Sequence, residues 1–134
     1  MTDTTGSPVR PDLDAADGFR YLQRMVAKTA TDAGWYKDPA TGQEIKRNFG
    51  EVVALMHSEL SEALEADRKG LMDDKLPHRD GREVEFADCI IRIMDTAESL
   101  GFDLAGAIIE KNAFNRQRAD HKLANRATAQ GKRY

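Results

Sequence analysis

Two pairs of acidic residues carry the clearest chemical signal in this chain. Glu59 and Glu62 lie three residues apart, and Glu85 and Asp88 repeat that spacing further along. Side chains three residues apart on a helix can reach one ion, because they lie about 60° apart around the axis. Four carboxylates that face each other would suit a hard divalent cation such as Mg²⁺, with Mn²⁺ as a possible substitute.

Glu59 falls on the predicted buried face of its helix. This helix is predicted from about Asn48 to Lys69, and its apolar residues gather on one side at about 100° per residue. That side is formed by Val52, Leu55, Met56, Leu60, Ala63, Leu64 and Ala66, with Glu62 at its edge. An ionised carboxylate withdrawn from water without a partner is too costly to keep. Glu59 must therefore be neutralised, ion-paired or bound to a metal.

A purely structural role for these acids is the alternative. Charged residues make up 32% of the chain, and acids at helical spacing commonly cover a solvated face. Arg92 follows Asp88 by four residues and could pair with it, while a salt bridge from Arg92 to Glu59 would neutralise the buried carboxylate. Glu65 follows Glu62 at the same three-residue spacing and could bind a second ion or hold a metal-bound water molecule.

Four helices are expected to position these groups, and no alternating β pattern of useful length is present, so the predicted fold is all-α. The first helix should span residues 14–33, and the second should begin after the cap residue Asn48 and end near Gly70. The third, residues 82–100, has an apolar arc of about 220°, which indicates packing on more than one side. The fourth should follow the cap residue Asp103 and reach about Arg118.

The length of 134 residues predicts one domain with tails. We expect a flexible N-terminal tail over residues 1–13, a helical domain over 14–119 and a polar C-terminal tail over 120–134. The net charge of −3 argues against a nucleic-acid partner. No stretch approaches the roughly 20 apolar residues of a membrane span, and no secretory segment precedes the domain, so we expect no membrane partner and a cytoplasmic location.

The two acidic pairs and a later lysine–asparagine pair together resemble a known family. The segments that carry the resemblance are HSELSEALEADRKG, LPHRDGREVEFADCIIRIMD and EKNAFNRQR. They are similar to the MazG-like all-α nucleoside triphosphate pyrophosphohydrolase superfamily, whose pattern is Glu-x-x-Glu, then Glu-x-x-Asp, then Lys-x-x-x-Asn. The likeness covers about residues 48–118 and is nearest to small phage or bacterial members, in which case the location would be the host cytoplasm.

This resemblance implies a four-helix bundle completed by dimerisation, as a homodimer or a dimer of dimers (a homotetramer). It also implies Mg²⁺-dependent hydrolysis of (deoxy)nucleoside triphosphates to the monophosphate and pyrophosphate, which would control the nucleotide pool. Glu59, Glu62, Glu85 and Asp88 would hold the metal. Glu65 or one of those four would accept a proton from the attacking water.

Candidate substrate-binding residues lie outside the acidic pairs. Lys111, Asn115 and Arg118 are spaced to share one helix face, and the resemblance places Lys111 and Asn115 at the Lys and Asn of the family pattern. They could hold the phosphates, although a solvated basic face is the simpler alternative. Trp35 could stack on the base, with Arg47 as a polar contact, or could instead be a core anchor.

Two other classes of function remain open. A di-iron carboxylate bundle also uses inward-facing acids, but it requires Glu-x-x-His pairs, and neither His57 nor His78 has that spacing to the acids. A non-catalytic helical oligomer or nucleotide-binding regulator would use the same acids for structure.

Overall fold

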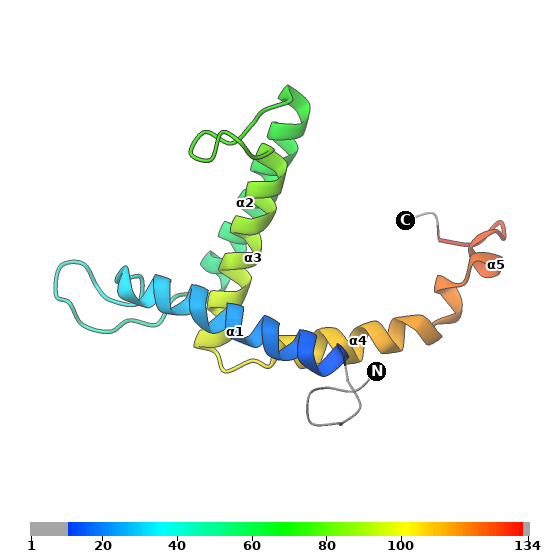
Figure 1. Cartoon of the computed structure of the whole chain (residues 1–134), viewed down its shortest axis with the longest axis horizontal. Coiled ribbons are helices and arrows are strands. Elements are labelled where there is room, and N and C mark those ends of the chain that lie inside the picture. The colour runs from blue at the N-terminus through cyan, green and yellow to red at the C-terminus, as the bar shows by residue number, and fades with distance from the viewer. Residues whose placement is uncertain (1–10, 133–134) are drawn as a thin grey trace. The chain divides into compact units, whose positions relative to one another are not determined.

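The computed structural model describes residues 11–132, and this part of the chain contains helices and loops without an extended strand (Figure 1). The all-α prediction is therefore confirmed. The elements in chain order are α1 (Pro11–Asp32), α2 (Phe49–Lys69), α3 (Gly81–Ser99), α4 (Leu104–Gln117), the short 3₁₀ helix η1 (Ala119–His121) and α5 (Leu123–Arg126).

The predicted caps of α2 and α4 are present. The Asn48 side chain accepts a hydrogen bond from the Glu51 amide at 3.1 Å, which satisfies one of the free amides at the start of α2. Gly70 ends α2 with φ of 61°, a left-handed conformation that glycine adopts without steric cost. Asp103 caps α4 through its 3.1 Å bond from the Gly106 amide.

The ends of the described chain differ from the expected boundaries. Helix α1 already begins at Pro11, which suits the first turn because proline has no amide hydrogen to leave unpaired. The rest of the predicted N-terminal tail, residues 1–10, lies outside the described residues. The predicted C-terminal tail contains part of η1 and all of α5, and Asp120 forms ion pairs there with Arg118 and Lys132.

Helices α2 and α3 run side by side in opposite directions and form the scaffold of the acidic site (Figure 1). Their contact is made of small or flexible apolar side chains. The buried members are Val52, Ala63 and Ala66 of α2, and Cys89, Met94 and Ala97 of α3. At the start of α3, a Cβ on Gly81 would lie only 2.9 Å from the Leu71 carbonyl oxygen, so this close approach requires glycine.

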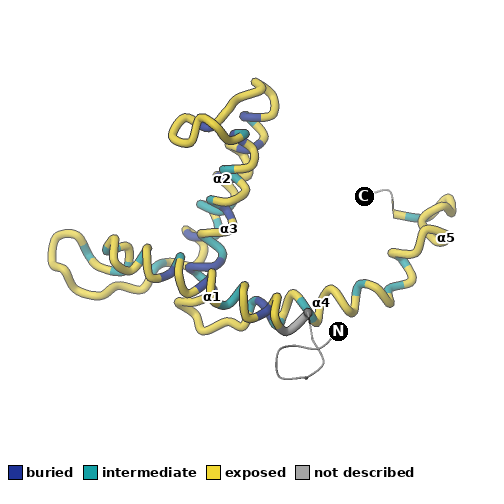
Figure 2. Tube along the Cα trace, in the orientation of Figure 1, coloured by how far each residue is buried: buried dark blue, intermediate teal, exposed yellow. Residues whose placement is uncertain are grey.

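Buried residues alternate with exposed ones along α2 and α3, as Figure 2 shows, and the buried stripe is narrower than the apolar pattern predicts. Leu60 and Leu64 of α2, expected on the buried face, are 46% and 61% exposed. Phe86 and Ile90 of α3 are likewise about half exposed. Each helix is covered by the other along only one stripe, so the wide apolar arcs exceed what this pairing can bury. We call these four residues the apolar face.

The described part of the chain divides into two compact units, the first of residues 21–102 and the second of residues 11–20 with 103–132. In the second unit Ala16 and Ala105 are buried, and the Arg20 guanidinium bonds the Asp103 carboxylate at 3.1 Å. No helix among residues 11–132 combines the length and apolar character that crossing a bilayer demands.

Candidate metal centre

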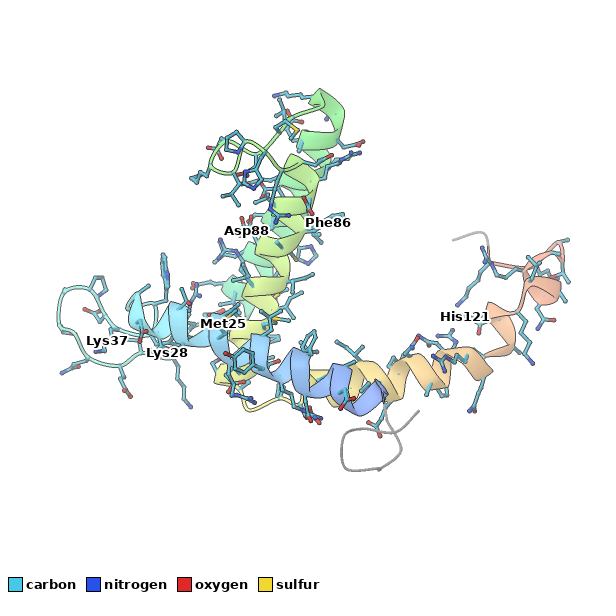
Figure 3. All side chains as sticks on the ribbon, in the orientation of Figure 1. Met25, Lys28, Lys37, Phe86, Asp88 and His121 are labelled. Carbon is cyan, nitrogen blue, oxygen red and sulfur yellow. The ribbon has the colours of Figure 1, made fainter. Side chains whose placement is uncertain are left out.

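Three of the four predicted carboxylates converge in the unit of residues 21–102. One carboxylate oxygen from each of Glu59, Glu85 and Asp88 lies within 4.8 Å of the others. Glu59 is contributed by α2, and the other two by successive turns of α3, so the antiparallel packing of the helices brings the two acidic pairs to one level. Figure 3 labels Asp88 on the opposite side of α3 from Phe86. Such an oxygen-only cluster could bind a metal ion.

The electrostatics of this acidic cluster favour a cation. Burial, followed by the negative charge of Glu62 and hydrogen bonding with Glu59, raises the pKa of Glu85 to about 7. Burial and the charge of Glu59 also raise the pKa of Asp88, against the lowering effect of Arg92. In addition, Glu85 Oε2 is buried and has no hydrogen-bond partner. A cation near these oxygens would relieve both the charge repulsion and the unsatisfied acceptor.

Glu59 also has a partner within the protein. Only 6% of this residue is exposed, and its Oε1 accepts a hydrogen bond of 2.5 Å from Arg92 Nε. The salt bridge considered from the sequence is therefore present, and Arg92 pairs with Glu59 across the helices rather than with Asp88 along α3. One guanidinium does not balance the cluster, because Glu85, Asp88 and the neighbouring Glu62 are further acids.

The two remaining acids of α2 lie at the edge of the cluster. Glu62 is exposed, and its charge acts on Glu85. Glu65 forms an ion pair with Lys69 at 2.6 Å. Both residues line a cleft of ≈ 540 Å³ together with Glu85, Asp88 and two acids of the following loop, Asp73 and Asp74. This acidic cleft extends the cluster toward solvent.

A second cavity connects the cluster to the predicted base-binding residues. Its volume of ≈ 290 Å³ is close to the lower end of the range of about 300–1,000 Å³ for small-molecule sites. Glu59, Asp88 and Arg92 line it together with Trp35 and Arg47. The Arg47 guanidinium carbon lies 5.9 Å from the centre of the Trp35 ring, within cation–π range. We call this space the Trp35 cavity.

Asp95 also lines the Trp35 cavity, and the sequence analysis did not identify it. It is 6% exposed, its Oδ1 has no hydrogen-bond partner, and burial raises its pKa. The sequence contains a pattern that would have identified Asp95. This residue interrupts the apolar arc of α3 between Met94 and Ala97, just as Glu59 interrupts that of α2.

The predicted phosphate-binding residues belong to the other unit. Lys111 and Asn115 share a face of α4, where the Lys111 ammonium lies 4.9 Å from the centre of the Phe114 ring. Asn115 Oδ1 is buried without a partner. Arg118 is not part of the helix, because it adopts the extended conformation of a C-cap, and its guanidinium makes two bonds to Asp120.

Comparisons with protein-family models, curated proteins and solved structures found no match to this chain. The features of this chain that bear on its function are therefore the geometry of the acidic cluster and the two cavities beside it.

Proposed function

We propose that this protein hydrolyses (deoxy)nucleoside triphosphates to the monophosphate and pyrophosphate, with Mg²⁺ or its possible substitute Mn²⁺, and thereby controls the nucleotide pool. The observation that carries the proposal is the convergence of Glu59, Glu85 and Asp88 within 4.8 Å, where these residues also line two cavities. The buried, unpaired Glu85 Oε2 supports a bound cation, because a cation there would satisfy an otherwise costly acceptor.

The donor set fits a hard metal ion, since Glu59, Glu85 and Asp88 each offer a carboxylate oxygen to the cluster. In this proposal Glu59, Glu62, Glu85 and Asp88 hold Mg²⁺, which would neutralise the triphosphate and lower the pKa of the attacking water. Glu62 and Glu65 are the candidates for accepting the proton from that water, because both line the acidic cleft at the edge of the cluster.

The remaining residues bind the nucleotide in this proposal. The base stacks on Trp35, whose ring lines the cavity next to the acids, and Arg47 supplies a polar contact. Lys111, Asn115 and Arg118 contact the phosphates, and Arg118 would have to exchange its Asp120 partner for a phosphate oxygen. The phosphate contacts depend on the resemblance to MazG-like enzymes rather than on a distance.

We also propose a MazG-like bundle completed by self-association, as a dimer or a dimer of dimers. Its support is the apolar face, since Leu60, Leu64, Phe86 and Ile90 are each 46–61% exposed. Large apolar side chains grouped on a surface commonly mark an interface. The net charge of −3 argues against nucleic acid as a partner. We propose a cytoplasmic setting without a membrane partner.

One observation favours a second candidate function. The Glu59–Arg92 ion pair neutralises the most buried acid without a metal. In a non-catalytic helical oligomer or nucleotide-binding regulator, this pair would fix the register of α2 on α3, and the other acids would remain near the surface. Stabilisation by nucleotide and Mg²⁺ with no turnover would support this candidate.

Pyrophosphate release tests the proposal directly. The purified protein with Mg²⁺ and a panel of (d)NTPs should release equal amounts of monophosphate and pyrophosphate. Glu59→Gln should reduce turnover about 1,000-fold, which corresponds to about 4 kcal/mol of lost transition-state stabilisation. Glu51→Gln is the matched control, because it makes the same change at an exposed position of the same helix.

Circular dichroism should show the same helix content in both variants. Orthophosphate as the only product, or full activity in the Glu59 variant, would contradict the proposed reaction.

A further inference from the structure

Asp95 is a buried acid that the proposed reaction does not use. Its Oδ1 has no hydrogen-bond partner, although the residue is only 6% exposed. The nearby Tyr36 hydroxyl lies 3.5 Å from the backbone carbonyl oxygen of Asp95 and, like the Arg47 charge, also stabilises the carboxylate, but Oδ1 itself is left without a partner. A buried carboxylate oxygen without a partner costs free energy, which a ligand that donates a hydrogen bond would recover.

The position of Asp95 suits contact with the base of a nucleotide. Asp95 lies seven residues after Asp88, which places it about 10 Å further along α3 and close to the same face of the helix. It lines the Trp35 cavity, which Glu59 and Asp88 of the acidic cluster also line. Phosphates held at the acidic cluster would therefore place the base in this cavity, whose wall includes Trp35, Arg47 and Asp95.

We infer that Asp95 is a specificity-determining residue, which accepts a hydrogen bond from a ring N–H or amino group of the substrate base in the Trp35 cavity. This inference deepens the proposed function and rests on it. Stacking on Trp35 tolerates any base, because every base has a π face. Asp95 adds selection, because an ionised carboxylate only accepts hydrogen bonds and rejects an edge that offers acceptors alone.

Binding can be measured without turnover, because Trp35 is the only tryptophan in the chain. We would titrate the full chain with nucleoside 5′-monophosphates, the proposed products, and follow quenching of Trp35 fluorescence. The probes are matched pairs that differ by one donor group. Three pairs differ by an amino group, namely guanosine and inosine, adenosine and purine riboside, and cytidine and 2-pyrimidinone riboside monophosphates, and one pair, uridine and 3-methyluridine monophosphates, differs by a ring N–H.

In the wild type, at least one pair should show about 10- to 100-fold weaker binding of the member that lacks the donor. Asp95→Ala should reduce this ratio to within about twofold, and Asp95→Asn, which keeps the shape and one acceptor oxygen, should give an intermediate ratio. Asp32→Ala is the matched control, since it removes an exposed aspartate at the end of α1 and should preserve the ratio.

The inference is overturned if no pair is discriminated by the wild type, or if both Asp95 variants retain the ratio. It is also overturned if they weaken both members of every pair equally, which would show a structural role. These outcomes are separate from the reaction itself. Discrimination that depends on Asp95 without pyrophosphate release would refute the proposed reaction alone, and pyrophosphate release without such discrimination would refute the role of Asp95 alone.

Discussion

The two sides of the α2·α3 pair are built from the same two helices, yet each exposes a different kind of unsatisfied group. On one side the carboxylates of Glu59, Glu85 and Asp88 converge, and the Arg92 guanidinium pairs with Glu59. On the other, Leu60, Leu64, Phe86 and Ile90 are half exposed to solvent. A cation would satisfy the first side and an apolar surface the second. The helix pair thus separates a polar site from a surface suited to association, with only about half a helical turn between them.

The largest losses of turnover and metal binding are expected for substitutions on the acidic side. They should be larger at Asp88, within the cluster, than at the exposed Glu62. Asp88→Asn should lower turnover about 1,000-fold and remove the heat of Mn²⁺ binding in calorimetry, because this carboxylate faces both Glu59 and Glu85. Glu62→Gln should have a smaller effect, since this side chain is exposed beside Glu85.

Glu65→Gln provides the internal control of this series for metal binding. It should retain the heat of Mn²⁺ binding and change stability by at most about 1 kcal/mol, the range of an exposed ion pair such as Glu65–Lys69. Equal losses of this heat in all three variants would indicate a general effect of acidic charge rather than a site built around Asp88.

The next largest effect is expected on the apolar face. Phe86→Lys should convert an oligomer into the 14.9 kDa monomer in sedimentation velocity, because a charge buried in an interface costs several kcal/mol. Leu123→Lys is the control, since this side chain is 80% exposed and lies in the other unit. A wild-type protein that sediments as a monomer at tens of micromolar would rule out self-association through this face.

Local chemistry explains which parts of the fold could be predicted from the sequence. Asn48, Gly70 and Asp103 act through their own or neighbouring backbone groups, so their capping roles could be inferred from residue type and position. The width of the buried stripe could not be inferred. Periodicity shows which residues are apolar, but exposure of Leu64 depends on how much of α2 is covered by α3.

The candidate site likewise has features that could be predicted from the sequence and features that depend on how the helices pack. Glu59 could be found because a carboxylate on an apolar face needs a partner, and the same argument would have found Asp95. The partner of Arg92 was harder to predict. Spacing along α3 favours Asp88, whereas the packing of the two helices brings Glu59 within hydrogen-bond distance. Contacts between helices depend on their register, which spacing within one helix does not contain.

The smallest expected effect is a pH dependence of stability that belongs to the acidic side alone. In the metal-free protein the pKa of Glu85 rises from 4.5 to about 7 on folding. The folded state therefore holds more protons than the unfolded state between these values, and the free energy of unfolding should fall as pH rises from about 4.5 to 7. Above about pH 7 the free energy of unfolding is lowered by the full contribution of Glu85 ionisation.

Thermal melts in chelator from pH 5 to 8 should therefore show a falling Tm in the wild type and a flatter profile in Glu85→Gln. The difference should be a few degrees, since about 1 kcal/mol shifts the Tm of a domain of this size by roughly 4 °C. Some slope should remain in the variant, because the pKa values of Asp88 and Asp95 are also raised.

Phe86→Lys should keep the wild-type slope at any protein concentration at which both proteins are monomeric. An identical slope in wild type and Glu85→Gln would show that Glu85 ionises as freely in the folded chain as in the unfolded one, and the acidic side would then have no excess repulsion for a cation to relieve.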